Sequence, residues 1–384
     1  MTKSKEVLLA KCDGRELADA AAHVNAALDK RSAIPILACL LIEPKDGELS
    51  LRATNLDMEA GQAVTADCKP GPEFRIAVDG QTLQQIAARM KGEVSLVLKR
   101  EPLTLTLVCG KAKAELAALP GSDWSSFDRS EDAVLLTLPS GLVASALKAT
   151  AHCQSTEQTR FYLNGTHVED REVALVFTAT DGHRLANLRS VIGSVEREGG
   201  RFEGVIIPRA AAAEIGRFAA WADGPMVVQI GERIIEVSAK GRYFASKLLD
   251  GTFPDYERVI PKGEDRKVVL KSKELGDAVG LVMNVSQERS RCVRFDLHDD
   301  HLEVSARGDQ HSARAVVEYE EGSAPGDDIT GGKGEHTFGL NAAYVLATLA
   351  VSGELVTLSM TDAMSPVLFH AGDELRQVIM PLRV

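Results

Sequence analysis

The strongest constraint on the fold of this chain is a short segment that occurs three times at nearly equal spacing. It spans residues 175–186, and related segments span 49–60 and 302–313, 126 residues before it and 127 residues after it. Each segment begins with alternating apolar residues, has alanine at its fifth position and continues into a small, polar or glycine-containing turn. Alternation predicts a strand that is packed on at least one side. Repeats at this spacing in a chain of 384 residues indicate three whole domains rather than solenoid units.

Other predicted elements recur with the same spacing. The first helix of each third is predicted at 15–28, 140–150 and 272–283, and the second at 79–90, 208–219 and 340–350. A short apolar strand precedes each second helix (74–78, 205–207, 337–339), and another follows it (94–98, 227–230, 356–360). Asp79, Ser140 and Ser272 are N-cap candidates, and Pro208 is a candidate first helical residue. Four kinds of predicted element therefore recur at the same spacing in all three thirds of the chain.

Turn-rich and apolar stretches complete the domain prediction. The polar stretch 118–132 predicts a linker, 246–262 predicts a bent, non-helical connector, and the glycine-rich stretch 320–335 predicts a solvated or disordered loop. The run 34–42 predicts a buried strand, and the apolar terminus 378–384 predicts a tail that docks on the protein. We expect an α+β fold of three similar domains with boundaries at 1–130, 131–262 and 263–384.

Composition excludes several classes of protein. The chain is 45% hydrophobic, which is typical of a globular protein, but no run approaches the roughly 18 apolar residues of a membrane span. Because the N-terminus also lacks a signal-peptide pattern, we expect a cytoplasmic protein. Six cysteines stand far apart without a C-x-x-C pair, so buried free thiols are expected and a metal site is not. The formal net charge of −11 argues against avid binding of nucleic acid.

Catalysis has little support in this sequence. Thr180, Asp181 and His183 lie close together, but no nucleophile elbow, phosphate-binding loop, dinucleotide fingerprint or zinc-protease motif accompanies them. A structural turn or a binding surface is the favoured interpretation, and a hydrolase that uses Asp181 and His183 is the rival. We expect no catalytic residues, no metal and no cofactor.

Several stretches resemble the bacterial sliding clamp, the beta subunit of DNA polymerase III. These stretches are TATDGHRLA, SKLLDGTFPDYERVIP, RFYLNG, VIMPLRV and IPILACLLIE followed by TNLDME. They cover the chain in order, and TDGHRL together with FPDYxRVxP is highly specific. The resemblance implies the DNA clamp fold, with three copies of a helix-and-antiparallel-sheet domain in each chain. It also implies that two chains close head-to-tail into a ring, with the helices lining the bore.

This family is not catalytic, and its members confer processivity. The resemblance implies a homodimer that encircles duplex DNA without sequence preference and is not attached to a membrane. It implies that the ring tethers the DNA polymerase III catalytic subunit, the clamp loader and other proteins with a clamp-binding motif. The alternative within the family is a specialised paralogue that serves repair or inhibitor resistance rather than the main replicase.

The resemblance also reconciles an acidic chain with DNA binding. A ring that is linked topologically to DNA needs only weak contacts that allow sliding, and an acidic exterior limits other binding. The implied DNA-facing candidates are Lys30, Arg31, Lys148, Arg209, Arg217 and Lys273. Arg31 is the leading candidate, and the 155–160 loop is second.

In the family, partners place a short peptide with apolar anchors in a pocket between the second and third domains. The residues carried over to this chain are Arg160, Tyr162, Leu163, Thr180, Gly182, His183, Arg184, Leu185, Pro254, Arg258, Val259, Asn341, Tyr344, Met364, Pro366, Val378, Met380, Pro381, Leu382 and Arg383. Leu163, Leu185, Val259 and Met380 are expected as apolar walls, and His183, Arg184, Arg258 and Arg383 as donors at the rim.

Some residues depart from the family pattern. Met364 and Pro366 stand where a small or polar residue and a serine are usual, which predicts an altered peptide preference. Ala114 and Asn284 lie at the expected dimer edge, where larger apolar residues are expected, and predict a weaker dimer. Ser290 stands where some members have an aromatic residue that faces DNA.

Overall fold

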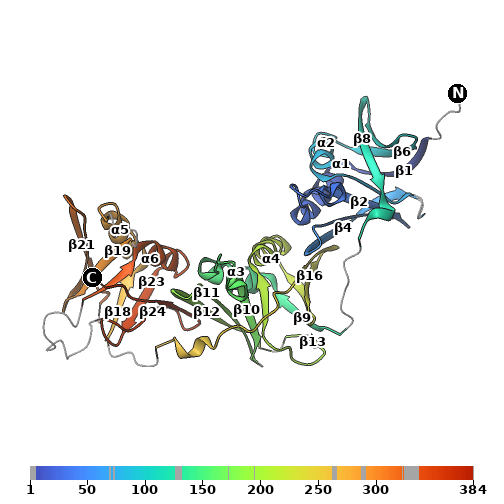
Figure 1. The fold of residues 1–384 in the computed structure, drawn as a ribbon. Helices are drawn as coiled ribbons and strands as arrows, with labels where there is room; N and C mark the ends of the chain where they lie inside the picture. The colour runs from blue at the N-terminus through green and yellow to red at the C-terminus, as the bar shows by residue number, and fades with distance from the viewer. Residues whose placement is uncertain are drawn as a thin grey trace. The chain divides into compact units, whose positions relative to one another are not determined.

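The computed structural model describes residues 6–68, 71, 74–125, 132–171, 173–193, 195–261, 266–286, 291–321, 323 and 337–383 (Figure 1). The chain forms two compact units. The first unit comprises Met1–Gly141, Val195–Gly200 and Arg217–Leu248, and the second comprises Leu142–Ser194, Arg201–Gly216 and Leu249–Val384. Helices α3 (Ser140–Thr150) and α4 (Arg209–Ala222) have residues in both units.

The first unit is built on a 13-stranded antiparallel sheet with the order β1-β6-β7-β8-β5-β2-β3-β4-β17-β16-β15-β9-β13. Its helices are α1 (Gly14–Val24) and α2 (Gly80–Ala87). The strands are β1 Glu6–Asp13, β2 Cys39–Lys45, β3 Glu48–Thr54, β4 Met58–Cys68, β5 Ile76–Asp79, β6 Glu93–Arg100, β7 Leu103–Cys109, β8 Ala112–Pro120, β9 Val134–Pro139, β13 Arg197–Glu198, β15 Pro225–Ile230, β16 Ile234–Ala239 and β17 Arg242–Lys247.

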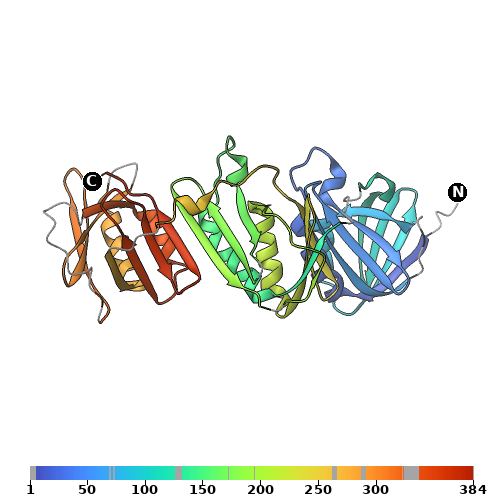
Figure 2. The same cartoon turned by 90° about the horizontal axis from the view of Figure 1, so that it is seen from below.

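The second unit contains two antiparallel sheets. The eight-stranded sheet has the order β14-β10-β11-β12-β25-β24-β23-β18, and the four-stranded sheet has the order β21-β20-β19-β22. The strands are β10 Gly165–Asp170, β11 Ala174–Thr180, β12 Arg184–Val191, β14 Val205–Pro208, β18 Arg266–Lys271, β19 Cys292–Leu297, β20 His301–Arg307, β21 Ser312–Glu318, β22 Thr337–Asn341, β23 Leu355–Met360, β24 Val367–Ala371 and β25 Leu375–Ile379. Figure 2 shows strands from the C-terminal end of the chain lying across helices α5 (Ser272–Met283) and α6 (Ala342–Leu349).

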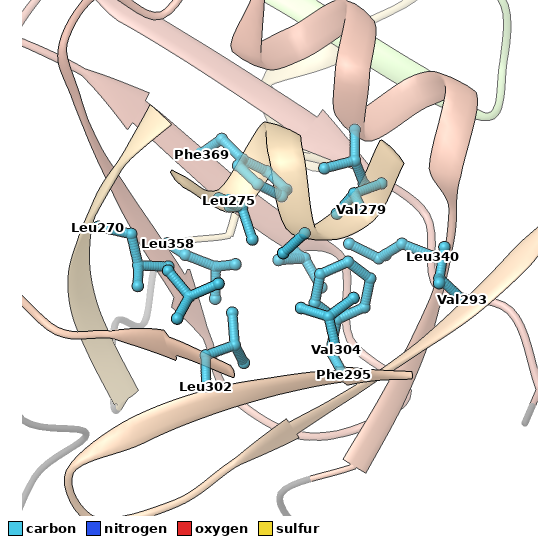
Figure 3. Close-up of a cluster of buried hydrophobic side chains, with 14 of the residues drawn as sticks. Leu270, Leu275, Val279, Val293, Phe295, Leu302, Val304, Leu340, Leu358 and Phe369 are labelled. Carbon is cyan, nitrogen blue, oxygen red and sulfur yellow. The ribbon is translucent and has the colours of Figure 1, made fainter. Parts of the chain in front are cut away.

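Both sheets of the second unit contribute to one hydrophobic core with these two helices. Leu275 and Val279 of α5 pack with Phe295 of β19, Val304 of β20 and Phe369 of β24 (Figure 3). All five side chains are completely buried. Burial of one such side chain stabilises a protein by about 1.5–3 kcal/mol, so this core holds the sheets and helices of the unit together.

The repeated segments form three corresponding β-hairpins: β3–β4, β11–β12 and β20–β21. The alanine at the fifth position pairs with the final alanine of the segment each time, as Ala53↔Ala60, Ala179↔Ala186 and Ala306↔Ala313. In the middle hairpin both alanines pack against the buried Cys153, so small side chains are needed there. The repeat predicted from sequence is confirmed, and the strand register is the same in all three hairpins.

The six predicted helices are present, and two of them have the predicted bounds. Asp79 caps α2 as expected, because its Oδ1 accepts a hydrogen bond from the amide of Thr82 at 2.7 Å. The other two caps were wrong. Ser272 is the first residue inside α5, whose N-cap is Lys271. Ser140 is likewise the first residue inside α3, and its Oγ accepts from the Gly224 amide at 3.1 Å. Pro208 ends β14, and α4 begins one residue later.

Three other sequence predictions need correction. The 34–42 run is not one strand, because Pro35 starts a 3-10 helix, Pro35–Ala38, before β2 begins. The 118–132 stretch begins with the end of β8 and a 3-10 turn, Gly121–Asp123. The connector 246–262 contains a 3-10 turn, Tyr256–Arg258. Most of the loop predicted at 320–335 lies outside the described residues.

The six cysteines differ in their exposure. Cys12, Cys39 and Cys153 are buried as expected, whereas Cys68, Cys109 and Cys292 are partly exposed. Throughout the described ranges, no helix has the length and apolar character needed to cross a membrane.

Candidate functional site

The turn between β11 and β12 is held by hydrogen bonds of its own residues. Asp181 Oδ1 accepts from the amides of His183 and Arg184 at 2.9 and 3.0 Å. Thr180 Oγ1 donates to the Arg184 carbonyl at 2.8 Å and accepts from the Gly182 amide at 3.1 Å. The local sequence therefore fixes the conformation of the turn and the direction of the residues that leave it.

Arg184 joins this turn to helix α6. Its Nε donates to Asp181 Oδ2 at 3.0 Å, and its guanidinium carbon lies 4.2 Å from the centre of the Tyr344 ring. Asn341 positions Tyr344, because its Oδ1 caps α6 by accepting from the Ala343 and Tyr344 amides. The Arg184 side chain is only 17% exposed. Arg184, expected as a donor at the rim, is therefore largely covered and engaged by two partners.

Arg160 approaches the same turn from another segment. A Cβ atom on Gly182 would lie 2.7 Å from Arg160 Nη1, and Gly182 has a φ of +89°. The backbone conformation therefore favours glycine at this position, and the guanidinium lies directly against it. Arg160 also pairs with Glu157, with Nε and Nη2 at 2.9 and 2.8 Å from Oε2.

The C-terminal tail passes beside this turn, as the apolar terminus predicted. Strand β25 pairs with β12 through Leu185↔Val378 and Arg184↔Ile379. Beyond the strand, the Met380 amide donates to the His183 carbonyl at 2.9 Å, and the Leu382 amide donates to the Gly339 carbonyl at 2.8 Å. The docked tail is confirmed, and it brings the last residues of the chain to the β11–β12 turn.

The apolar residues of the candidate pocket fall into two groups. Leu163, Leu185 and Val378 are buried in a cluster with Phe253 and Tyr256, and they support the site from beneath. Val259 is 44% exposed, Met364 65% and Met380 40%, so these three side chains offer apolar surface to a ligand. Of the four expected apolar walls, Leu163 and Leu185 are therefore buried, whereas Val259 and Met380 are exposed.

Phe161 was missed by the sequence reasoning although it adjoins predicted residues. Its side chain is 49% exposed, and its ring packs edge-on against Tyr162 at 5.9 Å between centroids. A large aromatic side chain that remains exposed beside a candidate pocket is a common feature of interaction surfaces. The RFYLNG motif contains Phe161, so the signal was present in the sequence.

The 254–259 segment is anchored by its buried Tyr256. The Tyr256 hydroxyl donates a hydrogen bond to Glu169, and burial together with that carboxylate raises the pKa of Tyr256 to about 12. Arg258 remains 83% exposed although it pairs with Asp255 at 2.7 Å. Pro254 is exposed beside them. Arg258 and His183, which is also exposed, are the available rim donors.

The remaining predicted pocket residues lie at the edge of this region. Pro366 is partly exposed directly before β24, and Met364 belongs to a turn in which its amide donates to Asp362 at 2.8 Å. Pro381 is also partly accessible. Arg383 instead lines a groove on the four-stranded sheet.

All six DNA-facing candidates have exposed side chains, as DNA contact requires. Lys148 lies on α3, Arg209 and Arg217 lie on α4, and Lys273 lies on α5. Lys30 and Arg31 follow the 3-10 helix that extends α1, and the Arg31 amide donates to Asp29 at 3.0 Å. Helices therefore carry four of the six.

The two unusual residues at the expected dimer edge have different surroundings. Asn284 caps the C-terminus of α5, because its Nδ2 donates to the Gly280 carbonyl at 2.7 Å. An apolar residue would lose that bond, so the helix end explains the polar residue. Ala114 is half-buried on β8. Ser290 lies outside the described residues.

Three family models match this chain in succession. The N-terminal, central and C-terminal domains of the DNA polymerase III beta subunit match residues 10–128, 137–255 and 257–383. The Escherichia coli K12 beta sliding clamp is 31% identical over 368 residues, which cover 94% of this chain and 96% of that protein. The Pseudomonas aeruginosa PAO1 beta sliding clamp is 30% identical over 369 residues, with the same coverage.

Solved structures show the same similarity in three dimensions. The C. crescentus beta sliding clamp has a TM-score of 0.88 at 28% identity, covering 99% of this chain and 100% of that chain. A sliding clamp from Bartonella birtlesii, solved with griselimycin bound, has a TM-score of 0.86 with the same identity and coverage.

Repeated helix-and-antiparallel-sheet domains with a docked C-terminal tail define the class of DNA clamps. Within that class, this chain belongs to the DNA polymerase III beta subunit family, the bacterial beta sliding clamps.

Proposed function

We propose that this chain is a cytoplasmic, non-catalytic processivity factor with domains at 1–130, 131–262 and 263–384. Two copies close into a ring around duplex DNA. The ring tethers the DNA polymerase III catalytic subunit, and the clamp loader and other partners use the same peptide pocket. The family membership of all three domains supports this proposal.

The observation that carries the proposal is the convergence of separate segments at the Asp181–His183 turn. Arg160 lies against Gly182, Arg184 stacks on Tyr344, and the Met380 amide binds the His183 carbonyl. Exposed apolar side chains accompany this turn, and His183 and the Arg258 guanidinium are accessible there. Exposed apolar side chains beside a few polar groups suit a peptide with apolar anchors.

The bonding of Asp181 argues against the rival hydrolase. One carboxylate oxygen accepts two backbone amides, and the other accepts the Arg184 guanidinium. Asp181 is therefore occupied in holding the turn and does not orient the His183 imidazole. Within the described ranges, no hydroxyl or thiol is hydrogen-bonded to the His183 ring, whereas nucleophilic catalysis requires such a pair.

The DNA contacts belong to the helices in this proposal. Lys148, Arg209, Arg217 and Lys273 contribute from α3, α4 and α5, and Lys30 and Arg31 contribute from the segment after α1. Exposed lysine and arginine side chains provide weak phosphate contacts that break easily with salt and permit sliding. The net charge of −11 limits contacts elsewhere on the protein.

Retention on circular DNA tests the proposal. The protein is loaded onto nicked circles by its clamp loader and passed through a sizing column, before and after the circles are linearised. We expect co-elution with circles and release from linear DNA, together with a free protein of about twice 41.2 kDa. A monomer that leaves circles and linear molecules equally fast contradicts the ring, and peptide binding without ring formation limits the protein to a docking module.

A further inference from the structure

A groove of about 720 Å³ lies over the four-stranded sheet of the second unit. It is lined by residues of β19, β20 and β21, by Ser286 after α5 and by one residue of the C-terminal tail. Its charged side chains are four arginines and two carboxylates, Asp296 and Glu303. We name the arginines the arginine face: Arg294, Arg307, Arg314 and Arg383.

Strand register places the arginine face beside the tail. Arg314 of β21 pairs with Ser305 of β20, and Ser305 pairs with Arg294 of β19. Arg294 pairs with Gly339 of β22, which in turn bridges to Leu382. One lateral row of residues therefore runs from the edge strand β21 across the sheet to the tail.

The arginine face lies on the side of the sheet that is turned away from α5. Val293, Phe295 and Val304 are buried against α5 in the core (Figure 3). Side chains alternate along a strand, so Arg294 and Ser305 point to the opposite side. Because α5 carries Lys273, the proposed DNA-facing residue of this part of the chain, the arginine face is not on the DNA-facing side.

The positive charge of this face is only partly compensated. Arg294 makes a two-point ion pair with Asp296, at 2.7 and 2.8 Å. Arg314 is 75% exposed and lies 3.5 Å from Glu303. Arg307 and Arg383 are exposed, and in the described part of the chain neither has an ion-pair partner. Such a surface is unusual in a chain with a net charge of −11.

The tail joins the arginine face to the proposed peptide pocket. The Met380 amide binds His183 in the pocket, and the Leu382 amide binds Gly339 next to Arg294. An extended chain advances about 3.3–3.6 Å per residue, so Met380 and Arg383 are at most about 10 Å apart along the tail. A partner segment that leaves the pocket needs only a few residues to reach the arginine face.

We propose that the arginine face is a second docking site, which binds an acidic segment adjacent to the apolar anchors of a partner peptide. This inference rests on the proposed function and adds a charge requirement to it. Guanidinium groups bind carboxylates through paired hydrogen bonds, and the unpaired Arg307 and Arg383 supply the free donors. The site favours partners with glutamate or aspartate beside their anchors.

Paired peptides test the inference. One peptide carries the two apolar anchors of a polymerase tail, and further versions add a short run of glutamates or of glutamines at either end. Affinity is measured by fluorescence anisotropy. We expect glutamates at one end to strengthen binding about three- to thirtyfold over glutamines at low ionic strength, because each exposed ion pair contributes little. High salt should remove most of that difference.

Arg307→Gln/Arg314→Gln should reduce the preference for glutamates severalfold, since Arg383 remains, and leave the affinity for the unextended peptide unchanged. The matched control is Arg89→Gln/Arg100→Gln, which removes two exposed arginines of the first unit and should keep the preference. A preference of unchanged size in the first variant overturns the inference. So does a variant that loses retention of duplex DNA instead, which would assign the face to phosphates. Failure of the unextended peptide to bind the unmodified protein overturns the proposed pocket, and the inference with it.

Discussion

At the scale of single residues, Arg184 couples the turn to helix α6. Its guanidinium pairs with Asp181 at 3.0 Å and lies 4.2 Å from the Tyr344 ring centre. A planar guanidinium can do both, whereas the compact ammonium of lysine stacks less well and offers no fixed fork of donors. The identity of the cation therefore matters here as well as its charge.

Arg184→Lys should lower the free energy of unfolding by about 1–2 kcal/mol, because it loses most of the stacking and part of the ion pair. It should also weaken binding of an anchor peptide, because Tyr344 is no longer held against the turn. Arg189→Lys is the control, since Arg189 is exposed on the same strand. Chemical denaturation measures the first effect and anisotropy the second. Equal results for the two variants would contradict a positioning role for Arg184.

His152 gives the second unit a pH-dependent stability. Burial, and after it the nearby Arg184 guanidinium, lowers the pKa of His152 to about 4. An unfolded histidine titrates near 6.5. As the pH falls, the unfolded state therefore binds a proton before the folded state does. The free energy of unfolding decreases between about pH 6.5 and pH 4.

His152→Gln should remove that loss. Relative to the unmodified protein, the variant should gain about 1–2 kcal/mol of unfolding free energy between pH 7.5 and pH 5. Thermal unfolding across this range measures the difference, and the unmodified protein at each pH corrects for other titrating groups. Parallel pH profiles for the two proteins would show that His152 is not buried in its neutral form.

At the scale of elements, the C-terminal segment has two separable parts. Strand β25 ends at Ile379 and belongs to the eight-stranded sheet, with β12 on one side and β24 on the other. The residues beyond it bind the His183 and Gly339 carbonyls. The first part supports the fold, and the second part borders the proposed pocket.

Deletion of residues 380–384 should weaken an anchor peptide roughly ten- to a hundredfold, because the pocket for one Leu-sized anchor contributes about 1.5–3 kcal/mol. The truncated protein should keep its secondary structure and its dimer, since the deletion leaves β25 intact. Anisotropy, circular dichroism and solution mass test the three expectations. Met364→Ala is a milder companion that keeps the tail and removes one exposed wall residue. Unchanged affinity after the deletion would place the pocket elsewhere.

At the scale of the whole molecule, an acidic chain must hold DNA without binding it tightly. The candidate contacts are exposed and belong largely to helices, and Arg31 is the leading one. Its amide bonds to Asp29, but the exposed side chain has no partner in the described part of the chain. Its role should therefore be separable from stability.

Arg31→Ala should reduce loading onto circular DNA modestly and make the loss with salt shallower, because one phosphate contact, and with it one released counterion, is removed. The melting temperature should not change, since surface substitutions of this kind alter stability by no more than about 0.5 kcal/mol. A loading assay at several salt concentrations, paired with thermal unfolding, measures both. A comparable loss of stability and of loading would show that Arg31 is structural.

Sequence by itself determined the repeated architecture, because its signals are local. Alternating apolar residues and turn residues mark the three hairpins, and helical periodicity placed α3 and α5 at their observed bounds. The TDGHRL motif also encodes its own turn, since Thr180 and Asp181 bond to residues within the motif.

Tertiary structure decided which residues meet, because local sequence patterns do not predict which distant strands pair. Only the β12–β25 register brings the tail to His183, and only the β22–Leu382 bridge carries Arg383 onto the four-stranded sheet. The same packing turned Arg184 from an expected rim donor into a wall residue stacked on Tyr344. Leu163 and Leu185 are buried, whereas Met380 is exposed. All three side chains are apolar, so their sequence could not show which of them the neighbouring strands cover.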